Sequence, residues 1–406
     1  MIYRIYRIVA LVIAGLSLVG LAACQTGAAT PPAQSPATPT RATPAAAAPA
    51  VRPTSPLSTN PPPTLPPPTV PPPTIPPPTL PPTDPPPTAT PSPTPGPSLR
   101  RITDGGCCVN PTWLPDSRRV VFIDRPPEGQ VGLYAVDTEA GGPPVLFAER
   151  LGYYAAGYSL LWQPVGQTIQ IQRLSDGQTF TVRNGGRTIN IAPDGQRVAW
   201  QVTPTQEGVP LEQRLSQVWV ADIDGQNARQ VASLLRASLT GWFPDGQRLL
   251  LSGRPDPKSQ AVALSVLDLA DGSVTELTRV ERLRNGSVSP AGGWVLYSVA
   301  FHPDKAQNGL WLVRSDGSER RRLDFYGAAQ WRSEGKLVYI PLDAEAAWHQ
   351  LWEYDAATGR SSPLTDPAAL PFKVSNGDWT VSPDGHKVVF VASQDRNLWV
   401  IDLPAP

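Results

Sequence analysis

The residues of this chain that could do acid–base chemistry are few. His302 and His349 fall in two long polar segments that follow one another along the chain, so their side chains could lie close together. The carboxylates of those segments (Asp304, Asp343 and Glu345) could form the acid and base pair of a glycoside hydrolase or lyase. The histidines have no evident base-and-nucleophile arrangement, and the chain has no G-x-S-x-G motif. We therefore expect a protein that is not an enzyme, with a glycoside hydrolase or lyase as the less favoured alternative.

The adjacent cysteines Cys107 and Cys108 could do redox chemistry. Exported thiols tend to oxidise, so the two either bond to each other, stay free or bridge to another chain. A disulfide between neighbouring residues would close a strained eight-membered ring, which could serve as a ligand platform or a redox handle. Three cysteines and three histidines are too few and too dispersed for a zinc framework, so we predict no metal and no cofactor.

Four aspartates recur in similar surroundings, which suggests a metal or acid–base site at first sight. They are Asp116, Asp194, Asp245 and Asp384. Each follows a proline, and in three of the four copies the next residue is glycine. Aspartate in a tight turn hydrogen-bonds its own backbone, and the glycine accepts a positive φ. We therefore interpret these aspartates as turn residues.

These turns belong to a repeated unit that starts at residue 99. Its first strand and turn occur as TWLPDSRRVVFI (112–123), LWQPVGQTIQIQ (161–172), NIAPDGQRVAWQV (190–202), GWFPDGQRLLLS (241–252), SVSPAGGWVLYSV (287–299), QWRSEGKLVYI (330–340) and TVSPDGHKVVFV (380–391). The copies are 43 to 51 residues apart, except for one interval of 29. Periods of about 40 to 50 residues, with four strands each, are typical of propeller blades.

A second motif repeats in the third strand of the unit, where an aromatic residue stands three positions before an aspartate. The pairs are Tyr134 and Asp137, Trp219 and Asp222, Trp352 and Asp355, and Trp399 and Asp402. The two motifs together resemble the TolB-type propeller repeat, a relative of WD repeats, over residues 99–406. We interpret the aromatic residues as packing between blades, because each buries a large apolar area.

The resemblance implies an all-β fold, a β-propeller of seven blades, or of six blades and a filler. The last copy ends at Asp402-Leu403, without room for a fourth strand, whereas Leu99–Thr103 has the character of that strand. We predict that it completes the last blade and closes the ring, which removes exposed sheet edges. The short interval leaves the second copy, with its second strand at 168–173, without a clear fourth strand.

Loop lengths predict which face of the propeller binds a ligand. The loops between second and third strands are long and unlike one another, and they should share a face with the connections between blades. Variable loops on a rigid scaffold commonly carry function. The candidate binding residues are Tyr153, Tyr154, Tyr158, His302, Phe325, Tyr326 and His349. The alternative is that these loops only cap the sheet edges.

The first 23 residues read as a secretory signal. Arg4 and Arg7 precede an apolar run over 8–19, and small residues then lead to Cys24. The run is too short for a membrane span of about 20 residues. The ending resembles the bacterial lipobox, which implies an acylated Cys24 and a lipid bilayer as a partner. The chain should then be an exported lipoprotein anchored on the extracytoplasmic side, at the cell surface or in the periplasm.

Residues 24–98 read as a stalk. Of the 51 prolines, 29 lie in this segment, and residues 61–80 repeat the pentads PPPTL, PPPTV, PPPTI and PPPTL. Such a segment has too little apolar surface to form a packed core, and its prolines favour an extended polyproline II conformation. A ligand for proline-binding modules is the alternative. We expect a disordered, semi-rigid spacer between the anchor and the propeller of residues 99–406.

The charge balance of the chain limits the classes of partner that it could bind. The chain has 34 basic and 34 acidic residues, so we predict no nucleic-acid partner, which would need clustered lysine and arginine. The favoured function is a non-catalytic module that binds an unknown protein or glycan. The alternative is an accessory or sensor subunit of a membrane complex.

Overall fold

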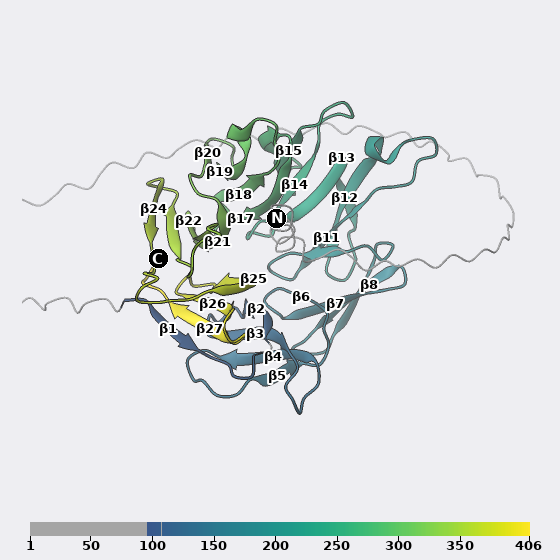
Figure 1. Ribbon diagram of the computed structural model, residues 1–406. Coiled ribbons are helices and arrows are strands. Elements are labelled where there is room, and N and C mark those ends of the chain that lie inside the picture. Colours follow the sequence, from purple (N-terminus) through teal and green to yellow (C-terminus); the bar gives the residue numbers. More distant parts are fainter. Residues whose placement is uncertain (1–95, 107) are drawn as a thin grey trace, which may run out of the picture. The chain divides into compact units, whose positions relative to one another are not determined.

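The computed structural model describes residues 96–106 and 108–406. The predicted signal peptide, Cys24 and nearly all of the predicted stalk lie outside these residues, and so does Cys107. Within the described part, no helix is long and apolar enough to cross a membrane. Apart from the short 3-10 turns η2 (Leu211–Gln213) and η3 (Lys305–Gln307), the regular elements of this part are antiparallel strands (Figure 1).

The described strands form five four-stranded sheets, each a blade of a β-propeller, and one seven-stranded sheet. The first two blades are β2 (Val109–Trp113), β3 (Arg119–Asp124), β4 (Gly132–Asp137) and β5 (Val145–Ala148), then β6 (Tyr153–Ala155), β7 (Leu160–Val165), β8 (Thr168–Arg173) and β9 (Thr179–Arg183). The seven-stranded sheet contains β10 (Ile189–Ile191), β11 (Arg197–Val202), β12 (Leu215–Asp222), β13 (Arg229–Trp242), β14 (Arg248–Arg254), β15 (Val262–Asp268) and β16 (Val274–Val280).

Three further blades complete the described part. They are β17 (Leu283–Val288), β18 (Trp294–Val299), β19 (Gly309–Arg314) and β20 (Arg320–Arg322); β21 (Gly327–Ser333), β22 (Lys336–Pro341), β23 (Trp352–Asp355) and β24 (Arg360–Pro363); and β25 (Val374–Val381), β26 (Lys387–Ala392), β27 (Leu398–Asp402) and β1 (Ser98–Arg101). The prediction of an all-β propeller is confirmed.

The prediction of seven separate blades, and its six-bladed alternative, is wrong. The third and fourth copies of the repeat form one continuous sheet because β13 runs through both of them. Its first half pairs with β12 up to Leu235, which is also opposite Arg254 of β14. Its second half pairs with β14 from Ser238 onward, after a register shift between Leu235 and Ser238. The segment from 229 to 240 contains no glycine or proline that would break the strand, so the connection between the copies itself adopts β conformation.

The second copy is also arranged differently from the prediction. Pro164 does not begin the turn after the first strand but lies within β7, the second strand of its blade. The first strand is β6, and the turn after it covers 156–159. This blade therefore has four strands, and the interval of 29 residues arose because its true turn contains no Pro-Asp-Gly sequence.

The strand before the first copy pairs with the last strand of the chain, as predicted. β1 lies antiparallel to β27, with Ser98 opposite Asp402 and Arg101 opposite Trp399 (Figure 1). The amide of Ile102 continues this contact by donating to the carbonyl of Leu398 at 2.9 Å. We call the contact of residues 98–103 with 398–402 the seam.

The core lies between successive sheets, and strands in it are buried on both faces. In β3, Val120 and Phe122 pack against β26 and β27 of the last blade, whereas Val121 faces the second blade. All three side chains are fully buried. The two halves of the seven-stranded sheet pack on each other in the same way, through residues such as Val220 and Leu249. Two-sided burial explains the near-continuous apolar runs of the middle strands.

The recurring aspartates are turn residues, as predicted. The carboxylate of Asp245 accepts the amide hydrogens of Gln247 and Arg248 at 2.8 and 3.2 Å. Asp116, Asp194 and Asp384 accept amide hydrogens in the same position of their turns. The glycines that follow three of these aspartates have φ between 63° and 76°.

One turn takes its carboxylate from the neighbouring blade. In the fifth copy the aspartate is replaced by Ala291, and Glu334 of the next blade occupies its role. The Glu334 carboxylate accepts the amide hydrogens of Ala291 and Gly293 at 2.8 and 3.1 Å and the hydroxyl of Ser289 at 3.0 Å. The carboxylate that this turn lacks is therefore supplied by the neighbouring blade, and its hydrogen bonds join the two blades.

Candidate functional site

The long loops and the connections between blades lie together at one end of the sheets, as predicted. In the blade of β21–β24, the amide of Leu342, just after β22, donates to the carbonyl of Tyr326, just before β21, at 2.9 Å. The amide of His349 donates to the carbonyl of Phe372, which precedes β25, at 2.8 Å. We call this end of the sheets the loop face.

The loop between β18 and β19 is held by its own hydrogen bonds. Asn308 bonds His302 twice, accepting its amide hydrogen at 2.8 Å and donating to its carbonyl at 3.0 Å. The His302 Nδ1 accepts the amide hydrogen of Asp304 at 3.1 Å, and the Asp304 carboxylate caps η3 by accepting the amide hydrogen of Ala306. His302 and Asp304 thus have local structural roles, and the loop presents Phe301 with 72% of its surface exposed.

The loop between β22 and β23 is tied to the following connection through His349. The His349 Nδ1 accepts the amide hydrogen of Val374 at 3.2 Å, and its ring lies edge-on to Phe372 at 6.1 Å between centroids. Burial and the nearby Lys373 ammonium lower the pKa of His349. A neutral His349 suits this accepting role. Trp348, next to it, is 39% exposed.

The adjacent aromatic residues Phe325 and Tyr326 differ in role. The Phe325 ring stacks on Tyr339 with centroids 3.6 Å apart and is half-buried in the core. Tyr326 is 48% exposed on the loop face, beside Leu342, which is 59% exposed. The predicted pair therefore contributes one packing residue and one surface residue.

Four exposed apolar side chains of the loop face form what we call the loop-face group: Phe301, Tyr326, Leu342 and Trp348. Sequence reasoning found only Tyr326 among them. The sequence signal for the other three was the presence of large apolar residues in loops rich in polar residues: Phe301 in FHPDKAQNG, and Leu342 and Trp348 in LDAEAAWHQ. A contiguous exposed apolar patch with a polar rim marks an interaction surface. In this group the hydrogen bond from the Leu342 amide to the Tyr326 carbonyl places two of the four residues side by side.

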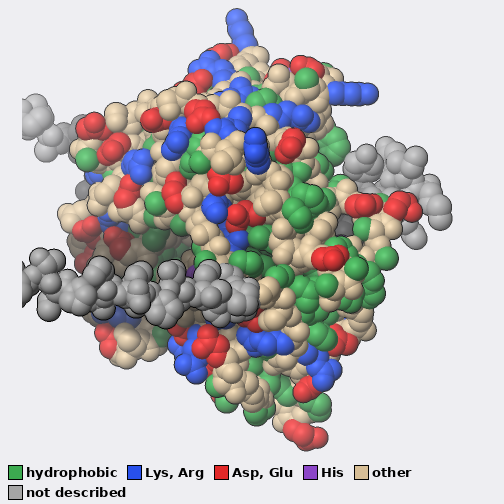
Figure 2. Space-filling model, turned by 90° about the vertical axis from the view of Figure 1, so that its left-hand side faces the viewer, with side chains coloured by type: hydrophobic (Ala, Val, Ile, Leu, Met, Phe, Trp, Pro, Cys, Tyr) green, Lys and Arg blue, Asp and Glu red, His purple; other side chains and the backbone are tan. Residues whose placement is uncertain are grey.

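The rim of the loop-face group has more carboxylates than cations. The same loops and connection carry four exposed carboxylates, Asp304, Asp324, Asp343 and Glu345, and one lysine, Lys305. Two cations of adjoining segments, Lys373 and Arg322, bond the loop carbonyls of Ala346 and Asn308. Figure 2 shows one side of the molecule, over which acidic and basic side chains are interspersed. Asp343 accepts the amide hydrogen of Glu345 at 2.9 Å, so it also has a local turn role.

Of the three predicted tyrosines of the second blade, Tyr153 lies at the start of β6 and is 42% exposed, whereas Tyr154 and Tyr158 are partly buried. Tyr158 lies in the turn after β6, beside the Pro-Asp turns, because Pro115 is the nearest neighbour of Gly157 in that turn. This corrects its predicted position, which followed from the misplaced turn. The Tyr154 ring lies 5.2 Å from Tyr158 and packs between the first two blades, and Tyr153 stacks on Trp162 at 4.3 Å.

The predicted disulfide involves Cys107, which lies outside the described residues. Cys108 is buried in the core between the first and last blades, with its Sγ 3.4 Å from the Thr103 hydroxyl. Burial raises the pKa of the Cys108 thiol. Among the described residues, no group of three or more histidine, cysteine, aspartate or glutamate side chains is placed to hold a metal ion.

Comparisons with known proteins support the fold. No protein-family model and no curated protein matches the chain. An oligogalacturonate lyase from Vibrio parahaemolyticus is 13% identical with a TM-score of 0.52, and the match covers 75% of this chain and 93% of that chain. The β-propeller domain of the Trilobed protease from Pyrococcus furiosus is 15% identical (TM-score 0.42, 74% and 85% covered), and TolB from Acinetobacter baumannii is 15% identical (TM-score 0.37, 70% and 78% covered).

These structural similarities are informative about architecture only. The lyase comparison supports the arrangement of sheets described above and shows nothing beyond the fold. Identities of 13 to 15% transfer no activity, and the other two similarities are too weak to carry an argument. A propeller fold by itself does not distinguish an enzyme from a binding protein.

Proposed function

We propose that this chain is an exported lipoprotein, anchored through acylated Cys24, whose propeller binds a protein partner through the loop-face group without catalysis. The lipobox-like ending at Cys24 and the proline-rich segment 24–98 support the anchor and the stalk. Acyl chains that each bury many methylenes, at about 0.8 kcal/mol per methylene, give a stable anchor when two or more are present.

The observation that carries the proposal is the exposure of large apolar side chains on loops that are otherwise well fixed. Leu342 and Trp348 are 59% and 39% exposed, although the loop that holds them is bonded to the connections on both sides. A fixed loop loses little conformational entropy when a partner binds, so the apolar area that it buries contributes more fully to affinity.

The chemistry of the face favours a protein with an apolar contact region bordered by lysine or arginine. Aliphatic Leu342 suits an apolar protein surface better than a sugar ring, and the acidic rim would attract a basic partner. A glycan stacking on Tyr326 and Trp348 is the other candidate ligand class. A partner within a membrane complex would make the chain an accessory subunit of that complex.

The candidate catalytic groups support a binding role. His302 and His349 each accept a backbone amide hydrogen through Nδ1, and the carboxylates of Asp304 and Asp343 cap local turns. Groups with such hydrogen bonds hold the loops in shape. A general acid or base must instead have its reactive atom within hydrogen-bond reach of the substrate, so we assign these groups to the structure of the loops rather than to catalysis.

The test replaces the loop-face group in the full-length chain. Cross-linking in native membranes, followed by purification, should recover a stoichiometric protein partner with the wild type, and this partner should be lost with the double substitution Leu342→Ser and Trp348→Ser. Val274→Ser is the matched control, since Val274 is 61% exposed on β16, away from the loop face. Because the rim is acidic, the association rate should fall as salt rises.

Two results would overturn the proposal. Equal recovery of the partner with the double variant would remove the loop-face group from the interface. Binding to purified glycans that the double variant loses, without any protein partner, would assign the face to carbohydrate instead.

A further inference from the structure

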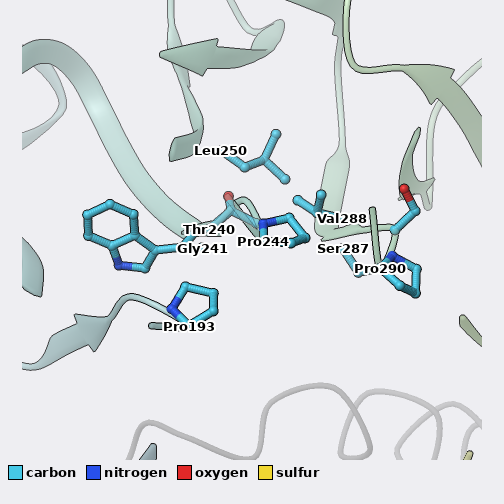
Figure 3. Close-up of a pocket in the computed structure, with 11 residues that line it drawn as sticks. Pro193, Thr240, Gly241, Pro244, Leu250, Ser287, Val288 and Pro290 are labelled. Carbon is cyan, nitrogen blue, oxygen red and sulfur yellow. The ribbon is translucent and has the colours of Figure 1, made fainter. Parts of the chain in front are cut away.

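A pocket lies at the opposite end of the sheets from the loop-face group, where the Pro-Asp turns are. It has a volume of about 410 Å³ and lies between the second half of β13 and β17. Figure 3 shows Pro193 and Pro290 toward its two ends, with Pro244, Leu250 and Val288 between them. We infer that this pocket binds an uncharged small ligand that combines an aromatic or branched apolar body with a hydrogen-bonding oxygen.

The walls of the pocket are apolar and fixed in place. The Trp242 ring is held by the hydrogen bond from its Nε1 to the carbonyl of Asn190 at 3.0 Å, and the guanidinium of Arg197 lies 5.7 Å from the ring centroid. Leu250 is fully buried at the back. The prolines come from three successive turns, so their rings are held by the turn backbone. Such a wall needs little rearrangement to receive an apolar group.

The polar groups at the pocket are neutral. They include the hydroxyls of Thr240 and Ser287, and the Ser287 hydroxyl accepts the Trp331 Nε1 hydrogen at 3.1 Å, which leaves its own proton available to a ligand. Among the described residues, no lysine, arginine, aspartate, glutamate or histidine lines the pocket. The described lining thus holds no counter-charge, and the Arg197 guanidinium behind Trp242 donates to Gln247 and to the Gly246 carbonyl. A charged ligand would lose hydration there, so the lining selects an uncharged one.

Two glycines line the pocket, one in a tightly packed place and one next to open space. At Gly286 a Cβ would lie 2.9 Å from Leu250 Cδ2 and 3.1 Å from Thr240 Cγ2, so only glycine lets β17 approach the sheet this closely. At Gly241 a Cβ would meet no atom within 4 Å, and its φ lies outside the left-handed region. A larger side chain at 241 would therefore enter the pocket without straining the backbone.

This site is independent of the proposed protein interface. The three prolines belong to turns after first strands. The loop-face group belongs to loops after second strands and to one connection between blades, at the other end of the sheets. The volume lies within the range of about 300–1,000 Å³ that is common for small-molecule sites. The chain can thus hold a small ligand and a protein partner at the same time.

The experiment uses isothermal titration calorimetry on the full-length chain in nanodiscs of zwitterionic lipid. The probes are N-acetyltryptophanamide, which is uncharged, and N-acetyltryptophan, which adds a carboxylate to the same body. We expect saturable binding of the amide at one site and at least tenfold weaker binding of the acid. Empty nanodiscs give the contribution of the lipid.

Three variants locate the binding. Gly241→Leu fills the pocket and should weaken binding of the amide at least tenfold, whereas Gly96→Leu, also placed in open space but before β1, should leave it unchanged. Thr240→Val removes one hydroxyl and should weaken binding about three- to tenfold, which corresponds to one hydrogen bond. If Gly241→Leu lowers the melting temperature, the affinity of Thr240→Val for the amide decides whether the pocket is the binding site.

The inference is overturned if the wild type shows no saturable binding of the amide. It is also overturned if a folded Gly241→Leu variant, or Thr240→Val in its place, binds the amide as the wild type does. Binding that is lost in the Leu342→Ser and Trp348→Ser variant but kept in Gly241→Leu would assign the probe to the loop face.

Discussion

The seam offers the sharpest test of how this propeller holds together. Thr103 follows β1 and is 4% exposed, and its hydroxyl accepts the amide hydrogen of Leu398 in β27 at 2.8 Å. The same hydroxyl lies 3.4 Å from Asn397 Oδ1 and from Cys108 Sγ. Thr103→Val keeps the shape of the side chain and leaves the buried Leu398 amide without its acceptor.

The size of the effect follows from that single amide. An unsatisfied buried donor costs about 1–3 kcal/mol, so we expect the free energy of unfolding to fall by this amount. For a chain of this size, about 2 °C per kcal/mol gives a lower melting temperature by about 2–6 °C. Thr103→Ser keeps the acceptor and should cost about 1 kcal/mol or less.

Calorimetry measures the loss of stability, and hydrogen exchange shows where it acts. Thr365→Val is the matched control, because the buried Thr365 hydroxyl accepts the Leu351 amide hydrogen at 2.9 Å in the neighbouring blade and bonds no residue of the seam. Both valine variants should lose similar stability, but only Thr103→Val should speed exchange in residues 98–103 and 398–402. If Thr103→Val melts like the wild type, or exchange rises elsewhere instead, the seam does not hold the first strand to the last.

Two further predictions concern single side chains. Glu334→Ala should lower the free energy of unfolding by about 1–2 kcal/mol because three hydrogen bonds to the neighbouring turn are lost. Adding Ala291→Asp to this variant should recover part of the lost free energy of unfolding, measured by chemical denaturation, since other turns of this kind carry an aspartate at that position. If the double variant is no more stable than Glu334→Ala, the Glu334 carboxylate does not stand in for the missing aspartate. His349 has a folded-state pKa below its ordinary 6.5, so the unfolded chain binds the proton more readily and stability should fall as pH drops through 6.5 toward the folded-state pKa. His349→Asn should flatten this part of the stability–pH curve, and an unchanged curve would show that another group titrates there.

Much of the fold could be predicted because it depends on local patterns. The Pro-Asp-Gly turns and the aromatic-to-aspartate spacing located the strands of most copies, and the turn role of Asp245 and its equivalents was correct. The pairing of Leu99–Thr103 with the last strand was also correct. The second copy was misplaced because Pro164 imitates the turn motif while the true turn, 156–159, lacks it.

The candidate site was predicted less well than the fold. The loop face followed from loop lengths, but Phe325 turned out to be a core residue and Tyr158 lies at the other end. Neighbouring positions in a loop can face the core or the solvent, and sequence carries no periodic signal for that choice. The pocket beside Trp242 had no sequence signal at all, because its lining comes from turns and strands of three repeats.

The sequence by itself determined the repeated unit, its turns and the strand that completes the last blade, since these depend on residue spacing and on turn chemistry within a few residues. Only the tertiary structure decided that β13 runs through two copies, that Glu334 replaces the missing aspartate of a neighbouring turn, and that Gly286 lets β17 approach Leu250. Each of these depends on which segments lie side by side once the sheets have packed. That packing joins residues far apart in the chain, so no local pattern of the sequence encodes it.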